Sequence, residues 1–340
     1  MKDTADGHHK TLRIESWPVL DRDFPTDPLV RLCYYARLAP SSHNSQPWKF
    51  LVSGAEIDLM ADESRWLRAA DPDKREFHVS LGCALESLLV AADYGRYATT
   101  VTPFPLGPGT LVARVAVNLA GGQQRALPGS GLLEPMLTRR TSHLAFEPAH
   151  TVDDALRKSL YSCFDEEDVS LHFLADANAI RQLSELEYQA DKALLADDAY
   201  RAELGEWIGE GMLGTPWLLS KLAKLAVGHL PMEERVSKGD AARVASAPLM
   251  GLLTTRNDGP AEHVRVGQAF MRIALLAEAK GLRIQPVSQV LEHPASRGEL
   301  AGLFGLHDRH AQHLFRIGHA PAGTEAPRRR PLGELVMRGS

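Results

Sequence analysis

Residues 39–48, Ala-Pro-Ser-Ser-His-Asn-Ser-Gln-Pro-Trp, carry more hydrogen-bonding side chains than a simple turn requires. Turns are usually built from Gly, Asp and Pro, which suit the backbone geometry. This stretch instead holds adjacent hydroxyls, an imidazole and two carboxamides, and a proline near each end restricts its backbone. We therefore predict a rigid loop whose Ser41, Ser42 and Asn44 hydrogen-bond a planar, neutral ligand. A turn capped by its own Ser and Asn side chains is the alternative interpretation.

A second stretch that could do chemistry begins with two adjacent arginines, Arg139 and Arg140, followed by Thr141. A guanidinium group presents a rigid fork of donors to phosphate oxygens, and a threonine hydroxyl adds another donor. We expect an anion-binding site here, although a solvated surface pair is the commoner role of such arginines. A third basic group, residues 328–330, consists of three arginines before a proline, and a solvated basic tail is its alternative interpretation.

The spacing of apolar residues indicates which elements hold these groups. The loop at 39–48 connects a helix-like run at 29–38 to a strand at 49–52. A similar helix-like run at 152–164 precedes a predicted strand at 169–174, and an acidic turn without ligand-binding character joins the two. The order of elements therefore recurs, whereas the loop does not.

Two apolar-faced helices are also predicted at matching positions. One begins at His78 and ends near Gly95, and the other begins at His263 and ends near Gly281, an offset of 263 minus 78, or 185 residues. Each has a small residue early and a glycine where a helix would end. The chain therefore reads as an internal duplication, unless two buried helices match by chance.

Together these motifs resemble the nitroreductase superfamily. The loop is similar to its Ala-Pro-Ser-x-x-Asn-x-Gln-Pro-Trp signature, and residues 139–143 are similar to the Arg-Arg-Ser/Thr-x-Arg motif that opens nitroreductase subunits. In the two-subunit members FMN binds between subunits, and one subunit supplies the arginines while the other supplies the loop. Because the second half keeps the arginines and the first half keeps the loop, the chain resembles the fused, Acg-type branch over roughly residues 25–336.

The resemblance implies an α+β, nitroreductase-like fold. Two tandem halves would form an intramolecular pseudo-dimer with antiparallel or mixed sheets flanked by helices. We expect an N-terminal arm at residues 1–25, half one at 26–130 and half two at 131–336. An insertion at about 197–247 has Gly-rich turns beside tryptophans and resembles the lid of the Acg branch. An ordinary helix pair packed on the core is the alternative for this insertion.

The resemblance also implies roles for single residues. Arg139 and one or more of the arginines at 328–330 would hold the phosphate, Asn44 would bond the pyrimidine edge of the flavin, and residues 285–288 would aim backbone amides at flavin N5. One FMN per chain is expected, because the second copy of the loop is missing. No catalytic side chain or metal ligand is predicted, since the flavin carries the chemistry. The predicted cofactor-binding residues are Pro40, Ser41, Ser42, Asn44, Gln46, Arg139, Arg140, Thr141, His143, Gln285, Pro286, Val287, Ser288, Arg328, Arg329 and Arg330.

Position 143 departs from the family pattern, because it is a histidine where an arginine or lysine is usual. A permanent charge near the cofactor is thereby replaced by one that titrates near neutrality. We predict that FMN affinity weakens as pH rises through the pKa of His143.

Composition excludes several classes of protein. The chain has 340 residues, enough for one very large domain or two similar ones, and 44% hydrophobic with 24% charged residues is ordinary for a soluble protein. No apolar run approaches the ~20 residues of a membrane span, and the polar N-terminus does not resemble a secretory signal, so we expect a cytoplasmic protein. Three cysteines far apart argue against disulfides or a zinc site. A net charge of -5 without a long basic block argues against nucleic-acid binding.

Two functions remain open from the sequence. In the first, the chain is an FMN oxidoreductase that passes hydride from NAD(P)H to a nitroaromatic, quinone or similar small acceptor. In the second, it sequesters or stores FMN beneath a lid, without NAD(P)H turnover. The expected partners are FMN and a small-molecule acceptor, and the expected assembly is a monomeric pseudo-dimer or a weak homodimer.

Overall fold

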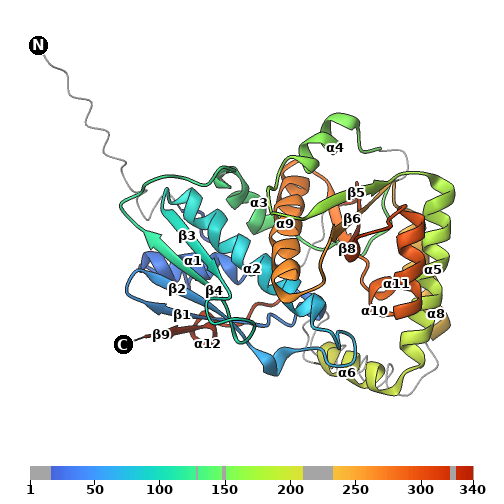
Figure 1. The fold of residues 1–340 in the computed structure, drawn as a ribbon, viewed down its shortest axis with the longest axis horizontal. Coiled ribbons are helices and arrows are strands. Elements are labelled where there is room, and N and C mark those ends of the chain that lie inside the picture. The colour runs from blue at the N-terminus through green and yellow to red at the C-terminus, as the bar shows by residue number, and fades with distance from the viewer. Residues whose placement is uncertain (1–16, 128, 148–150, 210–232, 322–326, 340) are drawn as a thin grey trace, which may run out of the picture.

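The fold is described from a computed structural model, which defines residues 17–127, 129–147, 151–209, 233–321 and 327–339. Two β-sheets lie on opposite sides of the molecule, and two long helices, α2 (Arg75–Tyr94) and α9 (Pro260–Ala279), pack side by side between them (Figure 1). The predicted α+β class with mixed and antiparallel sheets flanked by helices is confirmed. No helix of the described chain is long and apolar enough to cross a membrane.

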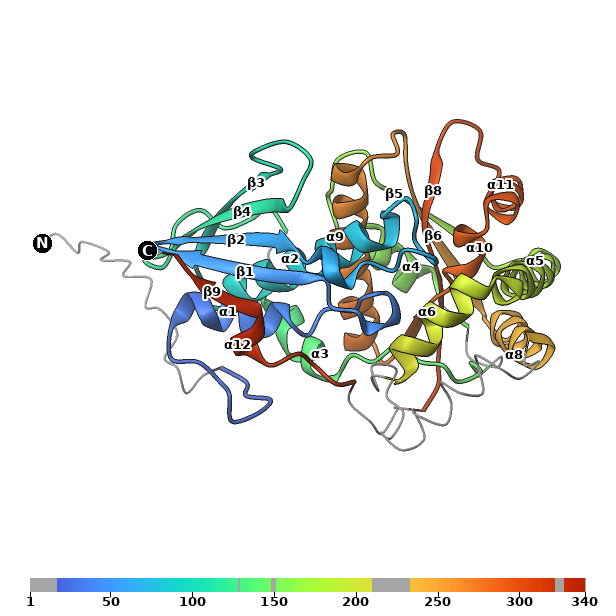
Figure 2. The same ribbon diagram turned by 90° about the horizontal axis from the view of Figure 1, so that it is seen from below.

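The first sheet has the strand order β3-β4-β2-β1-β9. Strand β1 alternates buried Trp48, Phe50 and Val52 with more exposed residues, as one apolar face of a half-buried strand requires. It pairs antiparallel with β2 and parallel with β9, so the C-terminal end of the chain closes a sheet formed by the N-terminal half (Figure 2). The strands are β1 (Trp48–Ser53), β2 (Glu56–Ala61), β3 (Ala98–Pro103), β4 (Leu111–Asn118) and β9 (Val336–Arg338).

The second sheet has the order β5-β6-β8-β7 and is antiparallel throughout. Without β9 the first sheet has the order β1-β2-β4-β3, so the two sheets are built from successive strands in the same arrangement. The predicted recurrence of element order is therefore present in the sheets, while the domain boundaries remain a prediction. The strands are β5 (Ser170–Leu174), β6 (Leu249–Thr255), β7 (Arg283–Pro286) and β8 (His310–Gly318).

Helices α2 and α9 start 185 residues apart and both contain 20 residues. They cross at Gly82 and Gly267, which are also 267 minus 82, or 185, residues apart. A Cβ atom on Gly82 would lie 2.0 Å from the carbonyl oxygen of Val264, and one on Gly267 would lie 2.0 Å from that of Val79. The contact is thus reciprocal, and only glycine at both positions lets the two backbones approach this closely.

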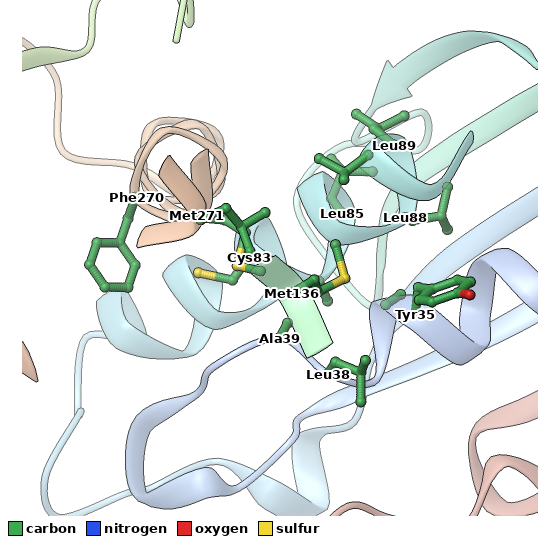
Figure 3. Close-up of a cluster of buried hydrophobic side chains, with 14 of the residues drawn as sticks. Tyr35, Leu38, Ala39, Cys83, Leu85, Leu88, Leu89, Met136, Phe270 and Met271 are labelled. Atoms are coloured by element: carbon green, nitrogen blue, oxygen red, sulfur yellow. The ribbon is translucent and has the colours of Figure 1, made fainter. Parts of the chain in front are cut away.

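The core is continuous around this crossing. Side chains from α2 and α9 meet others from α3 and from the end of the first helix (Figure 3). Trp17, in the segment predicted to be an arm, is also buried and stacks on Tyr35 and Tyr97. Trp17 therefore packs on the core, because its indole completes an aromatic cluster, whereas residues 19–23 of the same segment are exposed.

The remaining helices surround the sheets. Asp27 caps α1 and Asp153 caps α4, each by accepting bonds from backbone amides. Residues 210–232 of the predicted lid lie outside the described residues, and the flanking parts of that segment are helices α6 and α8. The helices are α1 (Pro28–Ala36), α3 (Leu133–Thr138), α4 (Asp154–Tyr161), α5 (Ala177–Ala196), α6 (Asp198–Gly209), α8 (Glu233–Ala245), α10 (Gln289–Glu292), α11 (Pro294–Leu303) and α12 (Leu332–Leu335), with short 3-10 turns at Ser42–Asn44, Glu63–Arg65 and Ser130–Leu132.

Candidate functional site

A cavity of about 820 Å³ is the candidate functional site. Its volume is within the ~300–1,000 Å³ typical of small-molecule sites. Segments far apart in the chain line it, including the loop at 39–48, helix α2, residues 139–144 and the end of β7. Of the predicted site residues, those that line the cavity are Pro40, Ser41, Ser42, Asn44, Arg139, Arg140, Thr141, His143, Gln285, Pro286, Val287, Ser288 and Arg329.

The loop has an unusual backbone. His43, Asn44 and Gln46 have φ angles of 48°, 53° and 51°, in the left-handed region that costs a non-glycine residue roughly 1–2 kcal/mol. Hydrogen bonds within the loop hold this shape: the Gln46 amide donates to Ser41 Oγ at 2.9 Å, and the Asn44 amide donates to the Ser41 carbonyl at 2.9 Å. Such strain persists only where surrounding contacts impose it. The loop is therefore held in one shape, as predicted, and not only by its prolines.

The C-terminal arginines supply many of those contacts. Arg329 donates to the carbonyls of Leu38 and Ala39, each at 2.8 Å, and to Asn44 Oδ1 at 3.0 Å. Asn44 in turn donates to the carbonyl of Arg328 at 2.9 Å. The structure thus brings together the loop at 39–48 and the arginines at 328–330, which lie about 280 residues apart in the chain. The hydrogen bonds of Arg329 stabilise the conformation of the loop.

Gln46 and Arg330 do not line the cavity but complete the same junction. The Arg330 amide donates to Gln46 Oε1 and its guanidinium donates to the Gln46 carbonyl, both at 2.9 Å. Arg330 also pairs with the Asp62 carboxylate at 3.2 Å. Because Arg330 already has an acidic partner, its charge is largely neutralised within the fold.

Arg139 differs from the other arginines of the site. Its side chain lines the cavity and is 3% exposed, and its Nε atom has no hydrogen-bond partner. Across the described residues no carboxylate pairs with it, and burial lowers its pKa to about 10. Burial and the nearby Arg139, Arg140 and Arg37 also lower the pKa of Arg329. This part of the cavity, which we call the arginine end, therefore carries positive charge that the surrounding fold does not balance.

Residues 141–143 follow the edge of the second sheet. Thr141 forms a bridge to Ile284, and the Ser142 amide donates to the Ile284 carbonyl at 3.2 Å. His143 then reaches Gln285, whose Nε2 lies 3.1 Å from His143 Nδ1. Burial, followed by the nearby Arg243, lowers the pKa of His143. The imidazole, which faces the open cavity, is therefore uncharged at neutral pH, and its predicted titration moves to lower pH.

A polar group that no sequence motif indicated also lines the cavity. Ser42 Oγ donates to Glu76 Oε2 at 3.0 Å, and His313 Nδ1 lies 3.5 Å from Glu76 Oε1. Burial alone would raise the pKa of Glu76, but the charge of Arg75 holds that pKa below its usual range. Glu76 therefore stays ionised and fixes the Ser42 hydroxyl. Its only signal in the sequence was its place at the start of the first repeated helix.

Acidic residues that the sequence interpretation did not single out line another part of the cavity. These are Glu187 of α5, Asp240 of α8 and Glu292 of α10. We call this part the acidic end. In the sequence, the acidic end could have been indicated by two acidic residues, Glu187 and Asp191, which lie one turn apart on the apolar face of α5.

One position that corresponds to a cavity residue under the 185-residue offset belongs to a hydrogen-bonded ion-pair network. Cys83 lines the cavity, whereas its counterpart Gln268 donates to Glu86 at 3.4 Å. Arg272 and Arg125 also pair with Glu86, at 2.8 and 3.0 Å. The counterpart of a cavity residue therefore contacts a buried carboxylate that two arginines already neutralise.

No family model matches the chain. The chain is nevertheless similar along most of its length to proteins named as nitroreductases, so the resemblance recognised from its motifs is confirmed. It is 28% identical over 327 residues to "Putative NAD(P)H nitroreductase acg" of Mycobacterium tuberculosis, covering 91% of this chain and 95% of that protein. It is 25% identical over 339 residues to "Probable NAD(P)H nitroreductase PigM" of a Serratia species, covering 86% of this chain and 89% of that protein. Among solved structures, the FMN-dependent nitroreductase NfnB of Mycobacterium smegmatis, in complex with NADPH, aligns with 62% of this chain and 99% of its own at 16% identity and a TM-score of 0.43.

Proposed function

We propose that this chain is an FMN-dependent oxidoreductase that takes hydride from NAD(P)H and passes it to a small acceptor such as a nitroaromatic or a quinone. The observation that carries the proposal is the buried guanidinium of Arg139, which lines the cavity without a carboxylate partner among the described residues. A buried cation is costly unless it is paired, and a phosphate group would supply the missing charge.

Other features of the cavity fit FMN. A flavin ring is planar and largely apolar, and the apolar side chains of Val79, Phe270 and Val287 line the same cavity as the polar loop. FMN needs a cationic group for its phosphate and neutral donors and acceptors for its ring edge, and both kinds of group are present. Gln268, the counterpart of the cavity residue Cys83, instead contacts Glu86 in an ion-pair network, which supports one FMN per chain.

The residues would act mainly by holding and orienting the cofactor. Arg139 would bind the phosphate, with Arg140 and Thr141 beside it. The loop, which Arg329 fastens, would present Ser41, Ser42 and Asn44 to the ring. When bound, FMN supplies the hydride transfer itself. The protein then decides which molecules reach the ring face, through the shape and charge of the rest of the cavity.

Reconstitution with FMN, followed by anaerobic mixing with NADPH or NADH, tests the proposal. We expect one FMN to stay with each chain through gel filtration, and its absorbance to bleach when a reduced nicotinamide is added. A protein that retains no FMN would contradict the proposal. Retained FMN that neither nucleotide bleaches would instead favour storage, the other function left open by the sequence.

A further inference from the structure

The acidic end of the cavity contains more carboxyl groups than the fold pairs with cations. Asp240 pairs with Arg243, and Glu292 accepts a hydrogen bond from the Tyr200 hydroxyl at 3.4 Å. Glu187 has no cation within the described fold. The three carboxyl groups come from three different helices, so the cluster forms only when α5, α8 and α10 are packed together.

Glu187 is the member that points to a ligand. It is 2% exposed and lines the cavity, and its Oε2 atom has no hydrogen-bond partner. Asp191, one turn further along α5, is equally buried, and its Oδ2 atom also lacks a partner. Glu187 is otherwise hydrogen-bonded by the backbone of Val290. Asp191 is hydrogen-bonded by the side chains of Asp240 and Gln289, so neither is balanced by a cation. A buried carboxylate without a cation is strongly unfavourable, so these groups either hold a proton or face a cation that is not part of the chain.

We propose that the acidic end binds the positively charged part of a small organic molecule, a protonated amine or a quaternary ammonium group. The further suggestion that this molecule is the electron acceptor rests on the proposed function. Phosphate is excluded as the ligand here, because its charge has the same sign as the carboxylates. A metal ion is not favoured, because the described residues contain no group of three or more His, Cys, Asp or Glu side chains placed to hold one.

The two ends of the cavity would then select two different ligands. The arginine end attracts an anion and the acidic end attracts a cation, while apolar residues such as Val79 and Phe270 line the same cavity. An aromatic molecule with one positive charge matches the acidic end in charge and the cavity as a whole in polarity. Buried charged groups of this kind usually give specificity, since a molecule of the wrong charge leaves them unpaired.

Binding of a cation should be linked to loss of a proton. Burial and the neighbouring acids raise the pKa of Glu187 well above its ordinary value, and they raise that of Asp191 to about 7. A bound cation favours the ionised form, so its affinity should rise with pH through neutrality. The charged and titratable groups that influence this cluster are Asp191, Asp240, Arg243, Glu292 and Tyr200, and beyond Glu292 they are Glu76, Arg75 and Asp71.

Calorimetric binding of three probes of similar size tests the proposal: benzylamine, which is cationic at pH 7, benzyl alcohol, which is neutral, and benzoate. We expect benzylamine to bind the full chain roughly tenfold or more tightly than the other two, from the usual strength of a charge-assisted bond. Titration in two buffers with different ionisation enthalpies should show release of about one proton on binding.

Variants of α5 and α10 identify the site. Glu187→Gln keeps the shape of the side chain and should weaken benzylamine binding roughly tenfold or more, with less proton release. Glu185→Gln, an exposed position on the same helix, is the matched control and should bind like the parent. Glu292→Gln provides a second test if the first variant does not fold. Equal affinity for benzylamine and benzyl alcohol, or unchanged benzylamine binding in both Gln variants, would overturn the proposal.

The two proposals fail separately. Benzylamine binding is measured on the protein both with and without FMN, so it does not require flavin chemistry. Selective binding of benzylamine by a protein that retains no FMN would support the acidic site while contradicting the oxidoreductase function. Retention of FMN without preference for benzylamine would contradict the acidic site and leave the oxidoreductase function supported.

Discussion

Replacing Arg139 by methionine should make the ligand-free protein more stable and its binding of FMN weaker. The side chain is 3% exposed, lacks an acidic partner among the described residues and has a pKa lowered from 12.5 to about 10 by burial. A lowering of that size corresponds to about 3 kcal/mol against the charged form, at 1.36 kcal/mol per pKa unit. Methionine has a similar length and no charge, so removing the unpaired cation should raise the free energy of unfolding by roughly 1–3 kcal/mol.

The sign of the pH dependence follows from the same pKa. Because the folded state lowers the pKa of Arg139, the guanidinium is charged and unfavourable at every pH below about 10. The stability advantage of Arg139→Met should therefore be constant between pH 6 and 9 and shrink only at higher pH. FMN affinity should fall roughly 10- to 150-fold, because one charge-assisted bond to phosphate is worth about 1.5–3 kcal/mol.

Urea unfolding of the ligand-free protein gives the first quantity, and quenching of flavin fluorescence gives the second. Arg256→Met is the matched control, since the Arg256 side chain is 73% exposed. Its unfolding free energy should change by less than about 0.5 kcal/mol and its FMN affinity should stay the same. If Arg139→Met lowers the stability of the ligand-free protein, the Arg139 cation has a stabilising partner in the fold and is not an unbalanced charge. Unchanged FMN affinity would refute its role at the phosphate.

Three further changes test the frame around the cavity. Gly82→Ala should lower the free energy of unfolding by roughly 3 kcal/mol or more, because its Cβ would meet a backbone oxygen at 2.0 Å. The control, Gly298→Ala, places a methyl group in open space on α11 and should raise that free energy by less than about 1 kcal/mol. Equal shifts of the melting temperature in the two variants would contradict this prediction. Arg329→Gln should speed hydrogen exchange of the Gln46 backbone amide, because the loop at 39–48 and the residue before it lose three hydrogen bonds from Arg329. Unaltered exchange would show that the loop keeps its shape without Arg329. His143→Arg should bind FMN more tightly than the parent at pH 7, with an affinity that does not depend on pH. Because the pKa of His143 is lowered, the parent should gain FMN affinity only as pH falls below about 6.5. Identical affinity profiles for the two proteins would exclude an electrostatic role of residue 143.

Local patterns predicted much of the fold. Apolar spacing located the helices that became α1, α2, α4 and α9, together with β1 and β5. The 185-residue offset proved to relate two helices in direct contact, which cross at Gly82 and Gly267. Such features are readable because helix periodicity and strand alternation depend on near neighbours in the chain. The burial of Trp17, within the stretch predicted to be an arm, could not be predicted, since it depends on aromatic residues elsewhere in the chain.

The residue types of the candidate site could also be predicted. The uncharged polar loop and the arginine pair beside a threonine predicted a ligand with a planar, neutral part and an anionic part, although such arginine pairs are more often solvated at the surface. The sequence alone therefore determined which side chains could bind such a molecule. It did not determine which of them are free to do so.

That distinction depends on tertiary structure. Arg139, Arg329 and Arg330 are the same kind of residue in the sequence, but folding leaves Arg139 without a carboxylate among the described residues, uses Arg329 to fasten the loop and pairs Arg330 with Asp62. The acidic end likewise exists only because helices distant in sequence bring their carboxyl groups together. Burial and charge pairing are properties of the packed chain, because both depend on segments that approach only when the two halves fold against each other.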